Sequence, residues 1–182
     1  MIPLDNPAPQ NVPFDARCLV SDTEGQWLLV KPRDGDDWRF PGGRSLSSHG
    51  PADICRRELW AQLDLNLTLN ELMITTWTVP PGADEQGCLN FLFDCGVYRA
   101  GELSITIKQD DIVKTSWIGH RTALALLHPS DHCLISLSRG GQRYGEYFGD
   151  GAPDLDAPEG PLPTQAAGSV IALRPQDPPT AC

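Results

Sequence analysis

The sequence has little positive charge and no long apolar run. Its 14 lysines and arginines are outnumbered by 24 aspartates and glutamates, for a formal net charge of -10 at pH 7. Nucleic-acid binding normally rests on an excess of basic side chains on one surface, so we expect no nucleic-acid partner. No apolar run approaches the roughly 18 to 20 residues that cross a bilayer, and the acidic, proline-rich N-terminus does not resemble a signal peptide. We therefore expect a cytoplasmic protein without membrane association.

The sequence also lacks a close CxxC pair, although it contains six cysteines. That spacing is typical of zinc sites and redox motifs, and disulfides belong mainly to exported proteins. We therefore interpret the cysteines as reduced thiols, mostly packed in the core.

The apolar and turn-forming residues predict an alternation of strands and helices. A hairpin is expected over 16–32, a short strand over 38–40 and a helix over 51–63. Strands should follow over 72–81, 88–100 and 102–109, then a helix over 121–127 and a last helix over 131–139, capped by Ser130 and ended by Gly140 and Gly141. This order predicts an α/β fold with a mixed sheet.

The predicted helix over 51–63 has a clear start and an apolar face. Pro51 suits a first helical turn, where the missing amide hydrogen costs nothing. The apolar stripe on this helix consists of Ala52, Cys55, Leu59 and Leu63, at spacings of three and four residues.

The chain divides into three parts by composition. Residues 1–13 form an N-terminal extension, residues 14–148 a folded domain, and residues 149–182 a tail rich in proline and glycine. Because the tail has little apolar periodicity, we expect it to be disordered.

The stretch "WRFPGGRSLSSHGPADICRRELWAQLDL", residues 38–65, resembles the Nudix box. The matching positions, which align without a gap, are Gly43, Arg57, Glu58, Leu59 and Leu65. The resemblance covers roughly residues 14–151. It implies a Nudix-like α/β/α sandwich with a mixed β-sheet, and a hydrolase that cleaves a diphosphate-linked small molecule with magnesium or manganese.

The box departs from the family pattern at three positions that carry acid and at one glycine. His49 stands in place of the loop glutamate, Ala61 and Gln62 in place of the Glu-Glu pair, and Asp64 in place of a glycine. On a helix, positions 58, 61 and 62 share one face, where three carboxylates would form an oxygen cage for the metal.

This chain retains only one of those three carboxylates. Glu58, Gln62 and the Gly42 carbonyl would at best hold a weakly bound magnesium or manganese ion. Losing two charges beside a divalent ion should cost several kcal/mol even at an effective dielectric of about 20. The degenerate box therefore predicts a preserved scaffold with a weak or absent metal site.

Other side chains near the box are candidates for catalysis and binding. His49 could act with Glu58 as acid and base, or it could be a polar loop residue that faces water. Without the loop glutamate, Arg57 needs another partner, for which we consider the nearby aspartates.

Arginines and aromatic residues around the box are candidates for substrate binding. Arg39 and Arg44 could hold phosphate or carboxylate groups, or belong to a solvated mixed surface. Phe40 and Trp77 could line a ring-binding pocket, or pack in the core.

Three hypotheses for function remain open. The first is a Nudix-type hydrolase with weakened metal dependence, and the second is an enzyme that uses the same pocket for a metal-independent reaction. The third is a binding module that recognises a ligand or partner without cleaving it. Because the helix that carries Glu58 remains polar, we favour an enzyme acting on a small molecule. Exposed strand edges would also allow a homodimer.

Overall fold

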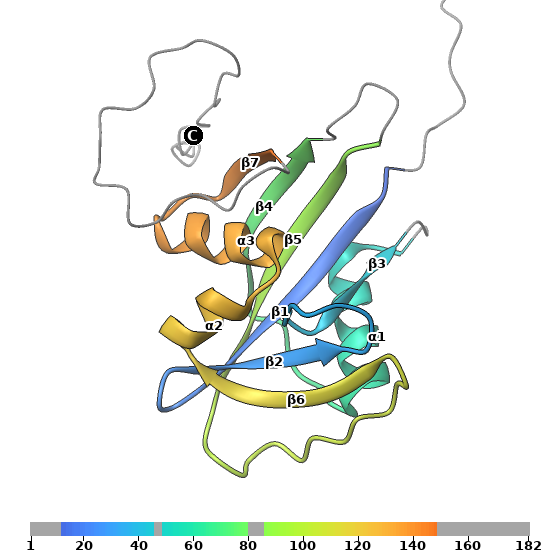
Figure 1. Cartoon of the computed structure of the whole chain (residues 1–182), viewed down its shortest axis with the longest axis vertical. Coiled ribbons are helices and arrows are strands. Elements are labelled where there is room, and N and C mark those ends of the chain that lie inside the picture. Colours follow the sequence, from blue (N-terminus) through green and yellow to red (C-terminus); the bar gives the residue numbers. More distant parts are fainter. Residues whose placement is uncertain (1–11, 46–48, 80–85, 149–182) are drawn as a thin grey trace, which may run out of the picture.

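The computed structural model describes residues 12–45, 49–79 and 86–148 (Figure 1). Apart from Val12 and Pro13, the predicted extension lies outside these residues, as does the predicted tail. The elements follow the order β1 (Phe14–Asp22), β2 (Gln26–Pro32), β3 (Gly42–Ser45), α1 (Pro51–Leu63), β4 (Glu71–Val79), β5 (Cys88–Tyr98), β6 (Ile112–Gly119), α2 (His120–Leu126), α3 (Pro129–Arg139) and β7 (Tyr144–Phe148).

The strands form one mixed sheet in the order β6-β2-β1-β5-β4-β7, with β3 paired to β1 off this path. The β1–β5 and β4–β7 pairs are parallel, while the β1–β2, β1–β3, β2–β6 and β4–β5 pairs are antiparallel. The predicted α/β class with a mixed sheet is confirmed.

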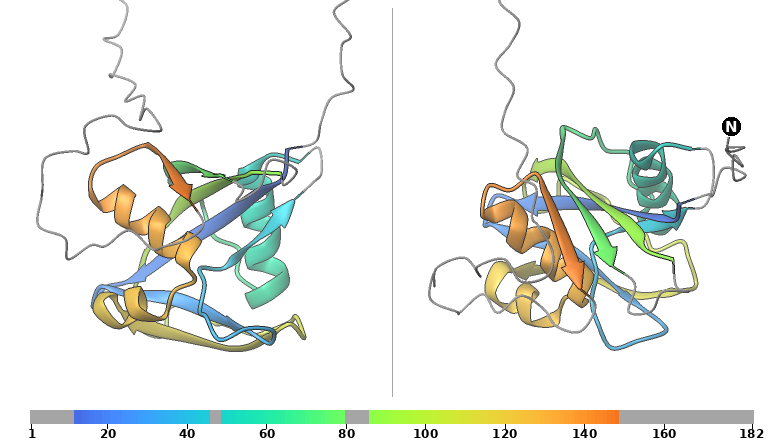
Figure 2. Two further views of the ribbon diagram at one scale, coloured as in Figure 1. Left: turned by 45° about the horizontal axis from the view of Figure 1, so that its top comes forward. Right: turned by 90° about the horizontal axis from the view of Figure 1, so that it is seen from above.

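Helices cover both faces of the sheet, so the predicted sandwich is also confirmed. Figure 2 shows α1 on one face and α2 with α3 on the other. Beneath α1 a core cluster contains Ile54, Cys55, Leu59 and Leu63, and beneath α2 and α3 a second cluster contains Ala123, Leu134 and Ile135. No helix in the described segments is long and apolar enough to cross a membrane.

Strand β1 changes partners along its length, and this divides the sheet near its centre. Its first half pairs with β3, from Phe14 opposite Ser45 to Arg17 opposite Gly42, while its end pairs with β2. Alternate side chains point to opposite faces of a strand. Arg17 therefore leaves β1 on the face covered by α3, at the point where β3 ends its pairing.

Two adjacent glycines allow β3 to lie between β1 and α1. A Cβ on Gly42, whose φ is +142°, would lie 2.0 Å from the carbonyl oxygen of Ala16. A Cβ on Gly43 would lie 2.8 Å from Cγ of Glu58. The Gly-Gly sequence is therefore required by close contact on both sides of β3, and it brings Glu58 against the strand.

Two predicted strands are wrong. Residues 38–40 form only isolated bridges, Val30 with Arg39 and Trp38 with Leu127. Residues 102–109 have no strand pairing. In that segment the amides of Thr106 and Lys108 donate to the carbonyls of Leu63 and Gln62, at 3.0 and 2.9 Å, in the last turn of α1.

The predicted cap of the last helix is displaced by two residues. Helix α3 begins at Pro129, and its N-cap is His128, whose Nδ1 accepts a hydrogen bond from the amide of Ser130. The imidazole thus performs the capping role that the sequence assigned to the serine hydroxyl.

Candidate functional site

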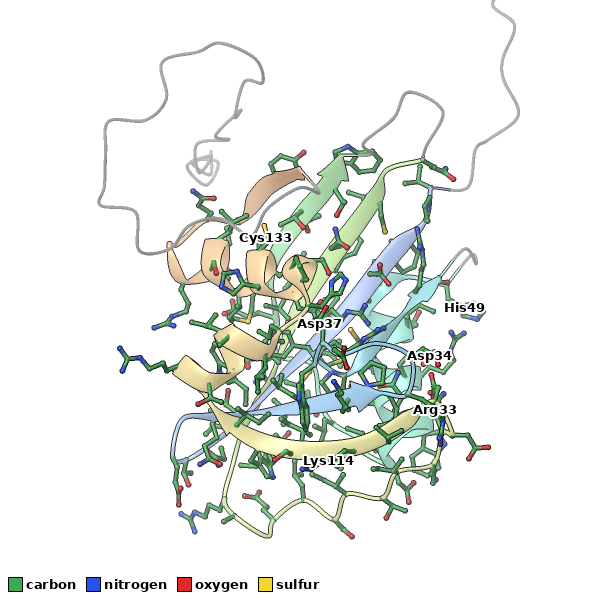
Figure 3. All side chains as sticks on the ribbon, in the orientation of Figure 1. Arg33, Asp34, Asp37, His49, Lys114 and Cys133 are labelled. Carbon is green, nitrogen blue, oxygen red and sulfur yellow. The ribbon has the colours of Figure 1, made fainter. Side chains whose placement is uncertain are left out.

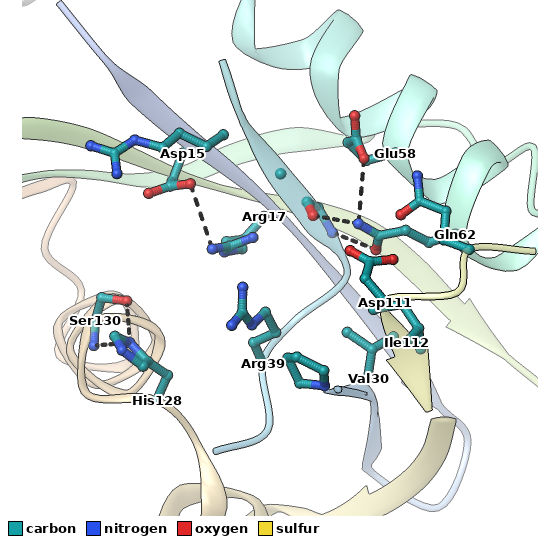
Figure 4. A pocket seen from close by; sticks show the side chains of 15 residues that line it. Asp15, Arg17, Val30, Arg39, Glu58, Gln62, Asp111, Ile112, His128 and Ser130 are labelled. Atoms are coloured by element: carbon teal, nitrogen blue, oxygen red, sulfur yellow. Dashed lines mark hydrogen bonds and ion pairs between the residues drawn. The ribbon is translucent and has the colours of Figure 1, made fainter. Parts of the chain in front are cut away.

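A pocket of about 440 Å³ opens beside Gly42 and Gly43 of β3 (Figure 4). One wall comes from α1 and β3, the floor from β1, and the opposite wall from the residues that precede and begin α3. The end of β2 and residues 109–112 complete the lining. The polar residues that line it are Asp15, Arg17, Arg39, Arg44, Glu58, Gln62, Gln109, Asp111, His128 and Ser130.

The side chain of Gln62 is paired with both backbone groups of Gly42. Its Nε2 donates to the Gly42 carbonyl at 2.7 Å, and its Oε1 accepts from the Gly42 amide at 3.2 Å. Gln62 is only 6% exposed. This buried pair ties α1 to β3 along the wall of the pocket.

Glu58 lies one turn before Gln62 and belongs to the same wall of the pocket. Its side chain is 15% exposed, and Arg57 donates to Oε1 through Nη2 at 3.0 Å. The other carboxylate oxygen, Oε2, accepts a weak hydrogen bond from Gln62 Nε2 at 3.4 Å. Arg57 therefore pairs with its own neighbour, and the expectation that an aspartate would be its partner is wrong.

The α1 wall has the spacing of a metal site but not its ligands. The Gln62 amide nitrogen, a hydrogen-bond donor, faces the Gly42 carbonyl and the Glu58 carboxylate, the oxygens that a cation would use. Ala61 offers no ligand. Among the described residues, no group of three histidines, cysteines, aspartates or glutamates is placed to hold a metal. These residues do not fit a bound magnesium or manganese ion.

The floor of the pocket contains an arginine that the sequence analysis missed. Arg17 is 8% exposed, and its Nε donates to Asp131 at 3.3 Å while its Nη2 lies 3.6 Å from Asp15. Burial lowers the pKa of Arg17, but the attraction of Asp131 and Asp15 outweighs it, and the net pKa is raised. The residue is therefore a fixed cation. Its only sequence signal is one basic residue within an apolar strand.

Arg39 and Arg44 extend this positive region. Both line the pocket, Arg39 half-buried beside β2 and Arg44 exposed on β3. Across the described residues, neither guanidinium belongs to an ion pair.

The other predicted site residues lie outside the pocket. Phe40 is fully buried and packs edge-on to Trp27, so its ring belongs to the core. Trp77 lies on β4, where its ring approaches Gly87. His49 is exposed near the edge of the molecule and does not line the pocket (Figure 3).

The sheet order, the helical layers and the position of the pocket define a Nudix fold. Among solved structures, this chain resembles the MutT protein of Methanosarcina mazei Go1. The identity is 14% and the TM-score 0.59, over 75% of this chain and 99% of that one. It also resembles the Escherichia coli dihydroneopterin triphosphate pyrophosphohydrolase, at 15% identity and TM-score 0.54, over 68% and 90% of the two chains.

A third similar structure is the Nudix domain of Shewanella oneidensis NrtR in complex with ADP ribose. Its identity is 14% and its TM-score 0.55, over 74% of this chain and 89% of that domain. No family model and no curated protein matches the sequence. At these identities the similarity shows the fold alone.

Proposed function

We propose that the pocket binds a small molecule through a negatively charged group, phosphate or carboxylate. The observation that carries this proposal is the convergence of Arg17, Arg39 and Arg44 on one cavity. Arginine presents a planar fork of donors that matches the oxygens of phosphate and carboxylate.

The distribution of charge in the pocket supports an anionic ligand. The lining carboxylates Asp15 and Glu58 are already paired with Arg17 and Arg57. Arg39 and Arg44 have no such partner in the described part of the chain, and of the lining acids only Asp111 is also outside an ion pair. The cations without partners therefore outnumber the anions without partners.

The neighbours by fold support a phosphate in particular. The Shewanella domain is described in complex with ADP ribose, and the E. coli enzyme is named for dihydroneopterin triphosphate. Both molecules carry linked phosphates. We therefore choose ADP ribose and inorganic pyrophosphate as probes.

A divergent enzyme with Glu58 as acid or base is the second candidate. It is favoured by the position of this carboxylate, which lines the pocket and is 15% exposed. A positioned carboxylate can transfer protons in a reaction that needs no metal. His49 lies outside the pocket lining, so this candidate rests on Glu58 alone.

Calorimetric titration of each probe into the full chain tests binding. We expect saturable binding to wild type, weakened about tenfold or more in Arg39→Gln, because one charge-assisted contact contributes roughly 1.5 to 3 kcal/mol. Arg99→Gln is the matched control, since Arg99 is exposed and does not line the pocket. The proposal is wrong if wild type binds neither probe, or if both variants bind as wild type does.

Product analysis of the same mixtures separates binder from enzyme. A binding module releases no product from ADP ribose, whereas an enzyme that depends on Glu58 releases product from wild type and none from Glu58→Gln.

A further inference from the structure

We infer that Gln62 takes over the structural role of a cation at the α1 wall, so that the wall is complete without metal. This inference concerns how the pocket is held in shape. It rests on the pocket of the proposed function, but not on which ligand the arginines bind.

The orientation of the Gln62 amide is determined by Gly42. Its oxygen faces the Gly42 amide at 3.2 Å, and its nitrogen faces the Gly42 carbonyl at 2.7 Å. The reversed amide would set donor against donor and acceptor against acceptor. The NH₂ group is therefore directed at the carbonyl side of Gly42.

The same NH₂ group connects two oxygens, neither of which carries a hydrogen to donate. An amide nitrogen carries two hydrogens. One is directed at the Gly42 carbonyl, and the second reaches Glu58 Oε2 at 3.4 Å. A bound cation would hold the same two oxygens together through its charge.

A divalent ion would have to displace this arrangement. It would break the 2.7 Å bond of a residue that is only 6% exposed, and leave a buried donor without a partner. It would also compete with Arg57 for Glu58, whose Oε1 lies 3.0 Å from the guanidinium. The wall therefore favours the metal-free state.

Restoring acid at two positions should restore the metal site. In Ala61→Glu/Gln62→Glu, the new carboxylates join Glu58 on one helical face, at spacings of three and four residues. The carboxylate introduced at position 62 would then face the Gly42 carbonyl with no hydrogen between them, and a cation would relieve that repulsion.

Electron paramagnetic resonance of Mn²⁺ measures this directly, without any phosphate ligand. Wild type should leave the free Mn²⁺ signal unchanged, while the double variant should bind Mn²⁺ at least about tenfold more tightly. Asn66→Asp/Ala125→Glu is the matched control. It makes the same kinds of change, amide to acid and alanine to glutamate, at exposed residues that do not line the pocket, and it should behave as wild type.

Thermal unfolding keeps the test decisive if the double variant is unstable. Gln62→Glu alone should lower the melting temperature, and Mn²⁺ should raise it again because it binds only the folded state. Mn²⁺ should leave the melting temperature of wild type unchanged. Stoichiometric Mn²⁺ binding by wild type that is lost in Glu58→Gln would overturn the inference, as would equal Mn²⁺ binding by the double variant and its control.

Failure of the inference about Gln62 and failure of the proposed function are distinguishable. Mn²⁺ binding reports on Gln62 and Glu58, whereas calorimetry with pyrophosphate reports on the arginines.

Discussion

Arg17 and Asp131 form a buried ion pair that joins β1 to the first turn of α3 beneath the pocket. Nε of Arg17 lies 3.3 Å from Oδ1 of Asp131, whose side chain is 1% exposed. Oδ2 of the same carboxylate accepts the amide of Phe40 at 2.8 Å. Asp131 therefore connects the floor of the pocket, helix α3 and the segment before β3.

Removal of Asp131 should be strongly destabilising. Asp131→Ala leaves the Phe40 amide without its partner and the buried Arg17 guanidinium with only the more distant Asp15, 3.6 Å away, so we expect a loss of about 3 to 5 kcal/mol in urea denaturation. Asp53→Ala removes the exposed Asp53–Arg56 pair, whose side chains are 63% and 53% exposed, and is the matched control. It should cost less than about 1 kcal/mol. Similar losses in both variants would contradict the role assigned to Asp131.

The two glycines of β3 should tolerate substitution to different degrees. Gly42→Ala places a Cβ against backbone at 2.0 Å, whereas Gly43→Ala meets the Glu58 side chain at 2.8 Å, which has some freedom to move. Gly101→Ala is the control for positive φ alone, since no atom lies within 4 Å of its Cβ position. Denaturant unfolding should show a larger loss of stability for Gly42→Ala than for Gly43→Ala, and a loss of about 1 kcal/mol for Gly101→Ala. A larger loss at Gly101 than at Gly42 is the contrary result.

Asp64 occupies a position that favours glycine. It ends α1 in the left-handed region, at φ 58° and ψ 31°, and its carboxylate pairs with Lys108 on the surface. Because an exposed pair contributes less than about 1 kcal/mol, Asp64→Gly should be slightly more stable than wild type. Asp64→Ala should be less stable by about 1 to 2 kcal/mol. Melting temperatures rank the three proteins. A glycine variant less stable than the alanine variant would show that the left-handed backbone conformation at residue 64 does not determine the order.

His132 should make the fold sensitive to acid. Burial lowers its pKa below the ordinary 6.5, and its Nδ1 is buried without a hydrogen-bond partner in the described region. The unfolded chain therefore binds the proton more tightly, so stability is lost as the pH falls through and below 6.5. His132→Leu should reduce the slope of unfolding free energy against pH between about pH 7 and 5. Parallel curves for wild type and variant would show that His132 does not contribute.

The spacing of the box was a sound guide to the fold. Helix α1 spans 51–63 as predicted, because its proline start and apolar stripe are local features. The proximity of Glu58 and Gln62 also followed from helical spacing, and the nearby Gly42 carbonyl was implied by the resemblance to the Nudix box. Their chemistry did not follow, since the direction of an amide depends on the backbone groups that it meets.

The predictions from the sequence fail where contacts with distant residues override a local pattern. Residues 102–109 alternate like a strand because Leu103 and Ile105 pack against the core beneath α1. The backbone amides of this segment, however, donate hydrogen bonds to the end of α1 rather than to a neighbouring strand. Arg17 gave little warning of its role, since its partner Asp131 lies 114 residues away. The resemblance to the box suggests that His49 lies near Glu58, but His49 does not line the pocket.

Metal-independent binding is tested most directly by pyrophosphate affinity in EDTA and in excess magnesium. Calorimetry with wild type should give binding in EDTA that is no weaker than in magnesium, because Arg39, Arg44 and Arg17 supply the positive charge and Gln62 holds the opposite wall. A loss of affinity of about tenfold or more in EDTA would contradict this, since it would mean that a divalent ion supplies more than about 1 kcal/mol of the binding energy.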